Sequence, residues 1–200
     1  MIYDFSRICK TYSENFYTRD FFNETSCPRC RARGRFNLHG SYSRHVVYFD
    51  KCKLVEELIK IKRIRCRSCE STHAVLPGDI IAYKLLSLFV QLSILFSFYL
   101  KEIPVLKLAS KLDFSFQYIY LCLKSFLIYV NNIHQLFRET KPKITCALES
   151  KSVLSLIDPP YIIFQRKFLE LNNRPCFMCK FYASGSGPPI GILSVKSAPT

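Results

Sequence analysis

Apolar and polar residues alternate in the first half of the chain in a way that predicts β-strands. Residues 35–39 and 45–49 are short β-prone runs on either side of Gly40-Ser41, which we interpret as a turn. Residues 59–65 alternate apolar with basic side chains, so we expect Ile59 and Ile61 on one face and Lys60, Lys62 and Arg63 mostly on the other. Residues 72–77 read as a closing strand that ends at a Pro-Gly turn. The pattern predicts a small β-rich unit.

The spacing of apolar residues becomes helical at about Ile81 and stays so to Arg138. Pro104 interrupts the run and suits the first position of a new helix over 104–112. After a short connection, Ser115 is placed to cap a third helix over 116–131. Three helices with a tight turn between the last two resemble a helix-turn-helix, although any three-helix bundle has similar spacing.

In the third helix one set of positions is expected to face the core, namely Ile119, Cys122 or Leu123, Phe126 and Val130. The opposite face carries Gln117, Tyr120 and Lys124, which could enter a nucleic-acid groove. The fold class that follows is α+β, with a β-rich unit, a helical bundle and a short strand-containing C-terminal segment.

We expect four regions along the chain: 1–26 packing on the β-rich unit, 27–80 as that unit, 81–140 as the helical bundle, and 141–200 as a C-terminal segment with a loose tail. Residues 153–157 and 161–164 are strand-like. Residues 183–189 are rich in Gly, Ser and Pro and are typical of a linker.

Two Cys-x-x-Cys pairs carry the most specific chemistry. Cys27 and Cys30 form the first pair, and Cys66 and Cys69 form the second, with 35 residues between the pairs. Two residues between cysteines allow a tight turn to aim both thiolates at one ion, and four thiolates suit tetrahedral Zn²⁺. The two pairs stand at the ends of a hairpin-rich segment. The sequence therefore predicts a structural zinc ribbon.

A third pair, Cys176 and Cys179, has no further ligands nearby and is more simply a buried or incidental pair. The chain has ten cysteines but does not open with the basic and apolar run of a signal peptide, so we expect reduced thiols and a cytoplasmic location. The apolar run 85–100 raises the alternative of membrane association. It is shorter than a bilayer span requires and contains serine and glutamine, which favours a buried helix.

The positive charge of the chain indicates which kind of partner it could bind. The net charge is +14, and residues 27–84 contain 13 basic and 5 acidic side chains. A compact basic unit favours an anionic polymer, because each neutralised phosphate releases counterions. A solvated basic surface without a partner is the alternative.

The motifs together resemble a known type of domain. They are Cys27-Pro28-x-Cys30, His39-Gly40-x-Tyr42-x-Arg44, Arg63-x-Arg65-Cys66-x-x-Cys69 and Thr72-His73-Ala74-Val75-Leu76-Pro77. Over about residues 25–130 the chain resembles the N-terminal zinc ribbons of bacterial insertion-sequence transposases, and more closely an uncharacterised bacterial family in which such a ribbon precedes helices. The resemblance implies mobile-element DNA recognition. Transposase nucleases need converging carboxylates, and only six scattered acids follow residue 84.

These observations predict a zinc-dependent DNA-binding protein that is not an enzyme, acting as an accessory factor, a regulator or a transposase remnant. A separate transposase or nuclease subunit is a possible partner. The candidate phosphate contacts are Arg29, Arg31, Arg33, Arg35, Arg44, Lys60, Lys62, Arg63, Arg65 and Arg67, and the candidate base contacts are Gln117, Tyr120 and Lys124. RNA binding stays open because the aromatic side chains could stack on bases. The second class is a zinc-ribbon protein-interaction module that binds no nucleic acid.

Overall fold

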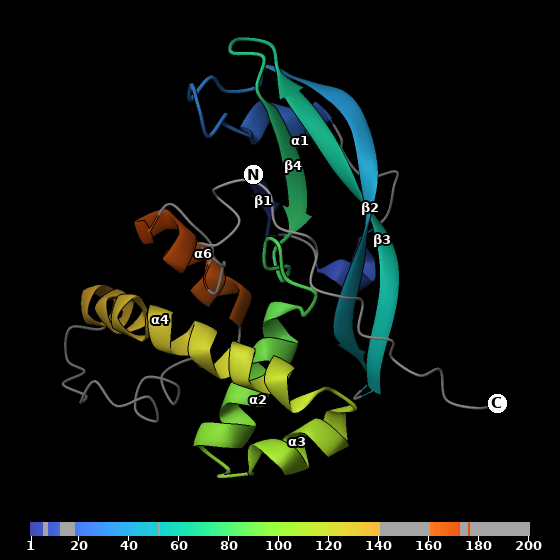
Figure 1. Ribbon diagram of the computed structural model, residues 1–200. Coiled ribbons are helices and arrows are strands. Elements are labelled where there is room, and N and C mark those ends of the chain that lie inside the picture. The colour runs from blue at the N-terminus through green and yellow to red at the C-terminus, as the bar shows by residue number, and fades with distance from the viewer. Residues whose placement is uncertain (6–7, 13–18, 52, 141–160, 173–175, 177–200) are drawn as a thin grey trace.

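The computed structural model of the chain describes residues 1–5, 8–12, 19–51, 53–140, 161–172 and 176. It is an α+β protein with a four-stranded sheet followed by helices, as the sequence predicts. The strands are β1 (Ile2–Asp4), β2 (Phe36–Asp50), β3 (Lys53–Cys66) and β4 (Thr72–Pro77), and their order in the sheet is β1-β4-β3-β2. In Figure 1 the helices of the second half lie to the left of the sheet and below β4.

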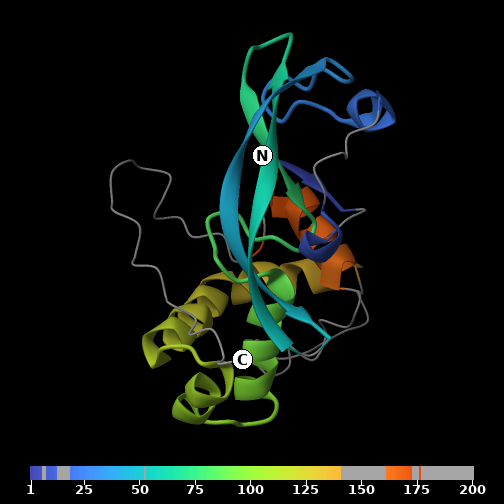
Figure 2. The same cartoon turned by 90° about the vertical axis from the view of Figure 1, so that its right-hand side faces the viewer.

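The antiparallel pair β2 and β3 is the longest feature of the sheet. Its register runs from Phe36 opposite Cys66 to Asp50 opposite Lys53. Figure 2 shows the two strands as a twisted ribbon that runs through most of the height of the molecule, from the helices to the opposite end. The long strands therefore separate the two cysteine pairs from most of the helices.

The predicted turn at Gly40-Ser41 is wrong. β2 continues through both residues, and the register shifts there, between Leu38 and Ser41. Gly40 has a φ of +87°, which an L side chain rarely adopts, so glycine permits the irregularity without breaking the strand. The two predicted β-prone runs are thus parts of one strand, and the hairpin turn lies beyond Asp50 instead.

The N-terminal residues complete the sheet and cover it. β1 pairs in parallel with β4, with Ile2 opposite Val75. The short helix α1 (Arg19–Glu24) lies near the cysteine turns, and the 3₁₀ turn η1 (Cys9–Thr11) covers the middle of the sheet. In η1, both the backbone N–H and the thiol of Cys9 donate to the buried carboxylate of Asp79, at 2.8 and 2.9 Å. This carboxylate ties η1 to the segment after β4.

The helices are α2 (Leu88–Tyr99), α3 (Val105–Leu112), α4 (Phe116–Thr140) and α6 (Tyr161–Asn172). We call them the helical layer. Helical structure begins at Leu88 rather than at Ile81, because residues 80–87 bridge to the sheet: Leu86 pairs with Val47, and the carbonyl of Val47 accepts from the N–H of Ser87. The Ser87 side chain then caps α2.

The predicted starts of α3 and α4 agree with the structure to within one residue. Pro104 is the residue that precedes α3, and the Ser115 hydroxyl accepts from the N–H of Tyr118, as a helix cap does. α4 extends nine residues beyond the predicted end at Asn131. Its predicted core positions are buried or partly buried among α2, α3 and α6.

Two further expectations concern the C-terminal segment. Residues 161–164 belong to the helix α6, not to a strand, because Phe164 and Phe168 lie one turn apart and both enter the core beside Tyr129. The predicted strand at 153–157 and the linker at 183–189 lie outside the described residues. No helix in the described part of the chain is long and apolar enough to span a membrane, and α2 covers only part of the apolar run.

Candidate metal centre

The two predicted cysteine pairs meet at the end of the sheet farthest from α3. The first pair lies in the turn before β2, and the second lies in the turn from β3 to β4. That second turn is the loop at the top of Figure 1. Phe36 pairs with Cys66 in the register of β2 and β3, and this pairing fixes how the two turns approach each other. We call the two turns, 27–32 and 66–71, and the adjoining ends of β2 and β3 the metal end.

Both turns have the same backbone geometry. In the first, the N–H of Arg31 donates to the carbonyl of Cys27 at 2.8 Å, and the N–H of Cys27 donates to Ala32. In the second, the N–H of Glu70 donates to the carbonyl of Cys66 at 2.9 Å, and the N–H of Cys66 donates to Ser71. The repeated hydrogen bonds turn both thiols of each pair toward one point.

The residue after the second cysteine of each turn is left-handed. Arg31 has a φ of 61° and Glu70 has a φ of 58°. Glycine would adopt this conformation without strain, whereas a side chain with a Cβ costs about 1 kcal/mol or more there. The metal end therefore contains two strained backbone positions that something else must stabilise.

The sulfur atoms are spaced as ligands of one ion. All four Sγ atoms lie within 4.8 Å of one another, and the Cys27–Cys69 and Cys30–Cys66 pairs are each 3.6 Å apart. A tetrahedral site with metal–sulfur bonds of about 2.3 Å has sulfur–sulfur edges of about 3.8 Å. The four cysteines could therefore bind a metal ion, and the predicted ligand set is brought together.

The thiols do not share negative charge equally. The hydroxyl and the backbone N–H of Ser71 lower the pKa of Cys69 to about 6. The backbone N–H of Ala32 lowers the pKa of Cys30, but partial desolvation and hydrogen bonds with the neighbouring thiols outweigh it and raise this pKa to about 12. Close thiolates repel one another, so four of them side by side favour a divalent cation at the centre.

His73 is a part of this centre that we did not assign from the sequence. Its ring Nε2 lies 3.3 Å from Cys27 Sγ, and burial lowers the pKa of the ring, which favours the neutral form. A neutral imidazole can donate one hydrogen bond to a thiolate and so hold it in place. The signal in the sequence is weak: His73 lies only four residues after Cys69 and opposite Ile64 in the register.

Seven of the predicted phosphate contacts surround the metal end, and all seven are exposed. They are Arg29, Arg31, Arg33, Arg35, Arg63, Arg65 and Arg67. Several are held by neighbours: Arg29 donates to the Ser71 hydroxyl at 2.9 Å, Arg65 pairs with Glu70 at 3.0 Å, and Arg67 donates to the Asn37 amide oxygen at 2.7 Å. Alternate positions of a strand share a face, so Arg63 and Arg65 lie on one side of β3.

The other predicted basic contacts lie elsewhere. Lys60 and Lys62 pair with Ser43 and Ser41 of β2 and lie on the other face of β3 from Arg63, so the expectation that these three share one face is wrong for Arg63. Arg44 is directed inward: its guanidinium donates to the carbonyl of Ile81 at 2.7 Å and also to the carbonyl of Lys84. The structure gives Arg44 a part in holding the segment before α2 rather than in a basic surface.

The predicted base contacts, Gln117, Tyr120 and Lys124, are exposed together on α4, far along the chain from the metal end. Cys176 is buried in the core of the helical layer, and Cys179 lies outside the described residues. That the chain is not an enzyme, and that these residues contact nucleic acid, stay predictions.

The fold and the centre together define an α+β protein with a four-cysteine cluster that could hold a metal ion. Residues 27–96 match a domain family described as a domain of unknown function, DUF6431. The match spans both cysteine turns, β2 to β4 and most of α2. No curated protein and no solved structure matches the chain. The resemblance to transposase zinc ribbons therefore stays a prediction.

Proposed function

We propose that the ion is Zn²⁺ and that its role is structural. Four thiolate donors suit zinc, and the sulfur–sulfur distances are close to the edge of a zinc–thiolate tetrahedron. A centre with four protein ligands has no open position for a substrate. Zinc would stabilise the two turns by neutralising the thiolates and offsetting the strain at Arg31 and Glu70.

We further propose that the metal end binds nucleic acid, with duplex DNA as the first candidate. The observation that carries this is the group of seven exposed arginines around the two cysteine turns. Guanidinium groups make paired hydrogen bonds to phosphate, and zinc would keep their turns in a fixed arrangement. Recognition of the kind that transposase zinc ribbons perform would use this end, with a separate nuclease subunit as a possible partner.

The positions of the basic residues on the two faces of the sheet allow the proposed DNA contacts to be assigned to one face. Arg63, Arg65 and the adjoining Arg67 lie near Asn37 on one side of the β2–β3 pair, whereas Lys60 and Lys62 lie on the other. One duplex cannot easily contact both sides of a sheet at the same level. We assign the arginine side to the phosphates and treat the lysine side as solvated surface.

The test is a titration of the zinc-loaded protein with duplex DNA at several salt concentrations. In the triple variant Arg63→Gln, Arg65→Gln, Arg67→Gln we expect weaker binding to all sequences alike. The slope of log affinity against log salt should fall by about one unit for each phosphate that is no longer neutralised. Zinc content is measured in the same samples, so that release of the metal is not mistaken for weaker phosphate binding.

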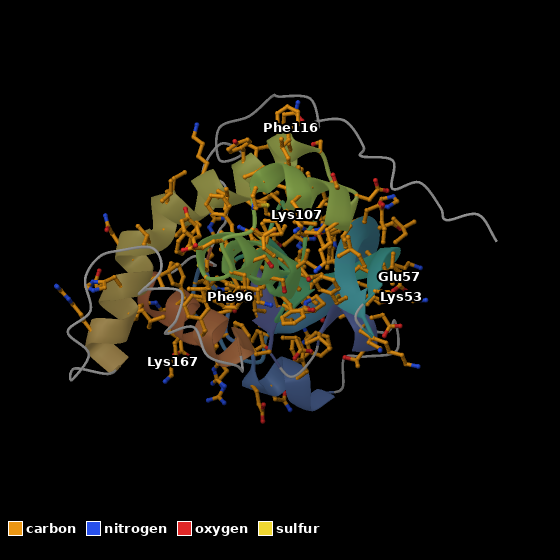
Figure 3. All side chains as sticks on the ribbon, turned by 90° about the horizontal axis from the view of Figure 1, so that it is seen from below. Lys53, Glu57, Phe96, Lys107, Phe116 and Lys167 are labelled. Carbon is orange, nitrogen blue, oxygen red and sulfur yellow. The ribbon has the colours of Figure 1, made fainter. Side chains whose placement is uncertain are left out.

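The matched control removes the same charge from the helical layer. Lys107 and Lys111 are exposed on α3 and Lys101 is exposed in the connection before it, and Figure 3 shows Lys107 among the helices. Their replacement by glutamine should change the slope much less. Equal effects in both triple variants would mean that only net charge matters. Absence of duplex binding by the wild type at about 50 mM salt would contradict the proposal and favour the protein-interaction module.

A further inference from the structure

The outer face of α4 contains five large apolar side chains that are about half exposed. Their exposed fractions lie between 45% and 57%. They are Phe116, Tyr120, Leu121, Leu127 and Ile128. Together they present an apolar area on the order of 400 Å², which is the size of the largest patch on a typical monomer, and such patches are often functional. Figure 3 shows Phe116 at the outer margin of the molecule, where α4 begins.

A polar line runs along the middle of this face. Gln117, Lys124 and Asn131 are all exposed and recur every seven residues, which is about two helical turns. One apolar row, Phe116, Tyr120 and Leu127, lies on one side of that line. The other row, Leu121 and Ile128, lies on the other side. The face is therefore nearly symmetric about Lys124.

We propose that this face binds a second copy of the same chain, with α4 packed against its counterpart. When two copies of such a face meet about a two-fold axis, apolar rows meet apolar rows and the polar lines lie together. In an antiparallel pair, which also opposes the two helix dipoles, Tyr120 would face Leu127 and Leu121 would face Ile128. The amides of Gln117 and Asn131 would then lie opposite each other.

The charge on the face disfavours other occupants. Lys124 is the one charged residue between positions 116 and 137 of the sequence. A duplex would find a single cation and two exposed leucines there, whereas recognition helices depend on several polar and basic contacts. An acidic peptide would likewise find one partner charge. The polar line and a surrounding rim extend the apolar area toward the roughly 800 Å² per partner that stable interfaces bury.

The self-association is independent of whether the metal end binds DNA, and it is tested without DNA. Sedimentation of the zinc-loaded full chain should show a dimer that dissociates on dilution. The double variant Leu121→Glu, Ile128→Glu should be monomeric at the same concentrations. In the dimer this apolar row packs against the same row of the second chain, so the variant would place acidic side chains in an apolar contact. Both side chains are about half exposed, so circular dichroism should show unchanged helix content.

Two variants make the test specific. Leu106→Glu changes an exposed leucine on the neighbouring helix α3 and should leave the dimer unaffected. Lys124→Leu removes a like-charge contact at the centre and should tighten the dimer roughly tenfold or more. A wild type that is monomeric at every concentration would overturn the proposal. A dimer whose affinity is unaffected by the changes at positions 121, 124 and 128 would also overturn the proposal, since its interface would lie elsewhere.

A third outcome separates this inference from nucleic-acid recognition by α4. If the wild type is monomeric and the uncharged change Gln117→Ala weakens binding to a preferred DNA site but not to random DNA, α4 reads DNA and the dimer proposal is wrong. If the dimer is found but no DNA binding is, the function proposed for the metal end fails and this inference stands.

Discussion

The metal end and the helical layer have very different amounts of apolar core. Among the described residues, the buried cluster that the helical layer forms with adjoining residues such as Val47 of β2 contains 21 side chains, with Phe126 and Phe168 fully buried. The cluster beside the cysteine turns contains six, and two of these are the cysteines Cys27 and Cys66. Burial can order the helices, but a cluster this small cannot offset the entropy of ordering two turns and two strand ends. The difference indicates that the metal end depends on its ion.

The largest effect should come from removing a ligand. Cys66→Ser should lose the metal and unfold the metal end, because metal binding supplies much of the folding free energy in so small a unit. We expect hydrogen exchange to become fast in the cysteine turns and in the adjoining ends of β2 and β3, while the helical layer stays protected. Metal analysis should fall from about one equivalent to near zero.

Cys122→Ser is the matched control, because it makes the same chemical change at a buried cysteine of the helical layer. It should retain the metal. A Cys66→Ser protein that lacks metal but keeps slow exchange throughout the metal end would contradict this prediction. The few apolar side chains of the metal end would then be enough to keep it folded without the ion.

The next effect tests the helical layer. Phe126 is fully buried on α4 and lies against Tyr99, with 5.5 Å between ring centroids. Phe126→Ala should lower the free energy of unfolding by about 3–5 kcal/mol, because it removes buried apolar area and leaves a cavity. Chemical denaturation followed by helix content measures this decrease.

Metal content should be unchanged in Phe126→Ala under conditions where the variant is folded. Leu106→Ala, at an exposed position on α3, should cost less than about 0.5 kcal/mol. If Phe126→Ala also released the metal while the helices stayed folded, the two regions would be coupled far more tightly than their separate cores indicate.

The features that local chemistry determines were predictable from the sequence. The Cys-x-x-Cys spacing predicted the four-sulfur cluster, because the turn that aims two thiols is encoded within each pair. The alternation of residues 59–65 predicted the part of β3 in which Ile59 and Ile61 are buried. Ser115 predicted the start of α4, because a cap needs only the next few residues.

The predictions failed where contacts with residues distant in the sequence determine the local structure. Gly40 suits a turn or a bulge equally well, and its role depends on the register with residues 62–64 on β3. Residues 161–164 are strand-formers by composition, but Phe164 pairs with Phe168 in a helical packing against α4. The segment before α2 looks helical until one knows that Val47 accepts its backbone hydrogen bond. His73 likewise joins the centre only through the sheet.

The smallest effect concerns the strained backbone of the metal end. Glu70→Gly should raise the free energy of unfolding of the metal-loaded protein by about 1 kcal/mol, because glycine adopts the left-handed conformation without a Cβ clash. The change also removes the exposed ion pair with Arg65, which is worth less than that. Glu70→Ala is the control: it removes the same ion pair but keeps the strain, so it should be no more stable than the wild type.

A glycine substitution at the end of α3 allows the backbone strain of the two regions to be compared by their gains in stability. Asp113 ends α3 with a φ of 54°, but a short polar side chain tolerates this conformation better than glutamate does. Asp113→Gly should therefore give a smaller gain than Glu70→Gly, measured by denaturation at saturating metal. Equal gains, or a Glu70→Gly protein no more stable than Glu70→Ala, would mean that the metal-loaded turns are not strained. The ion would then act by neutralising thiolates, with no backbone strain to offset.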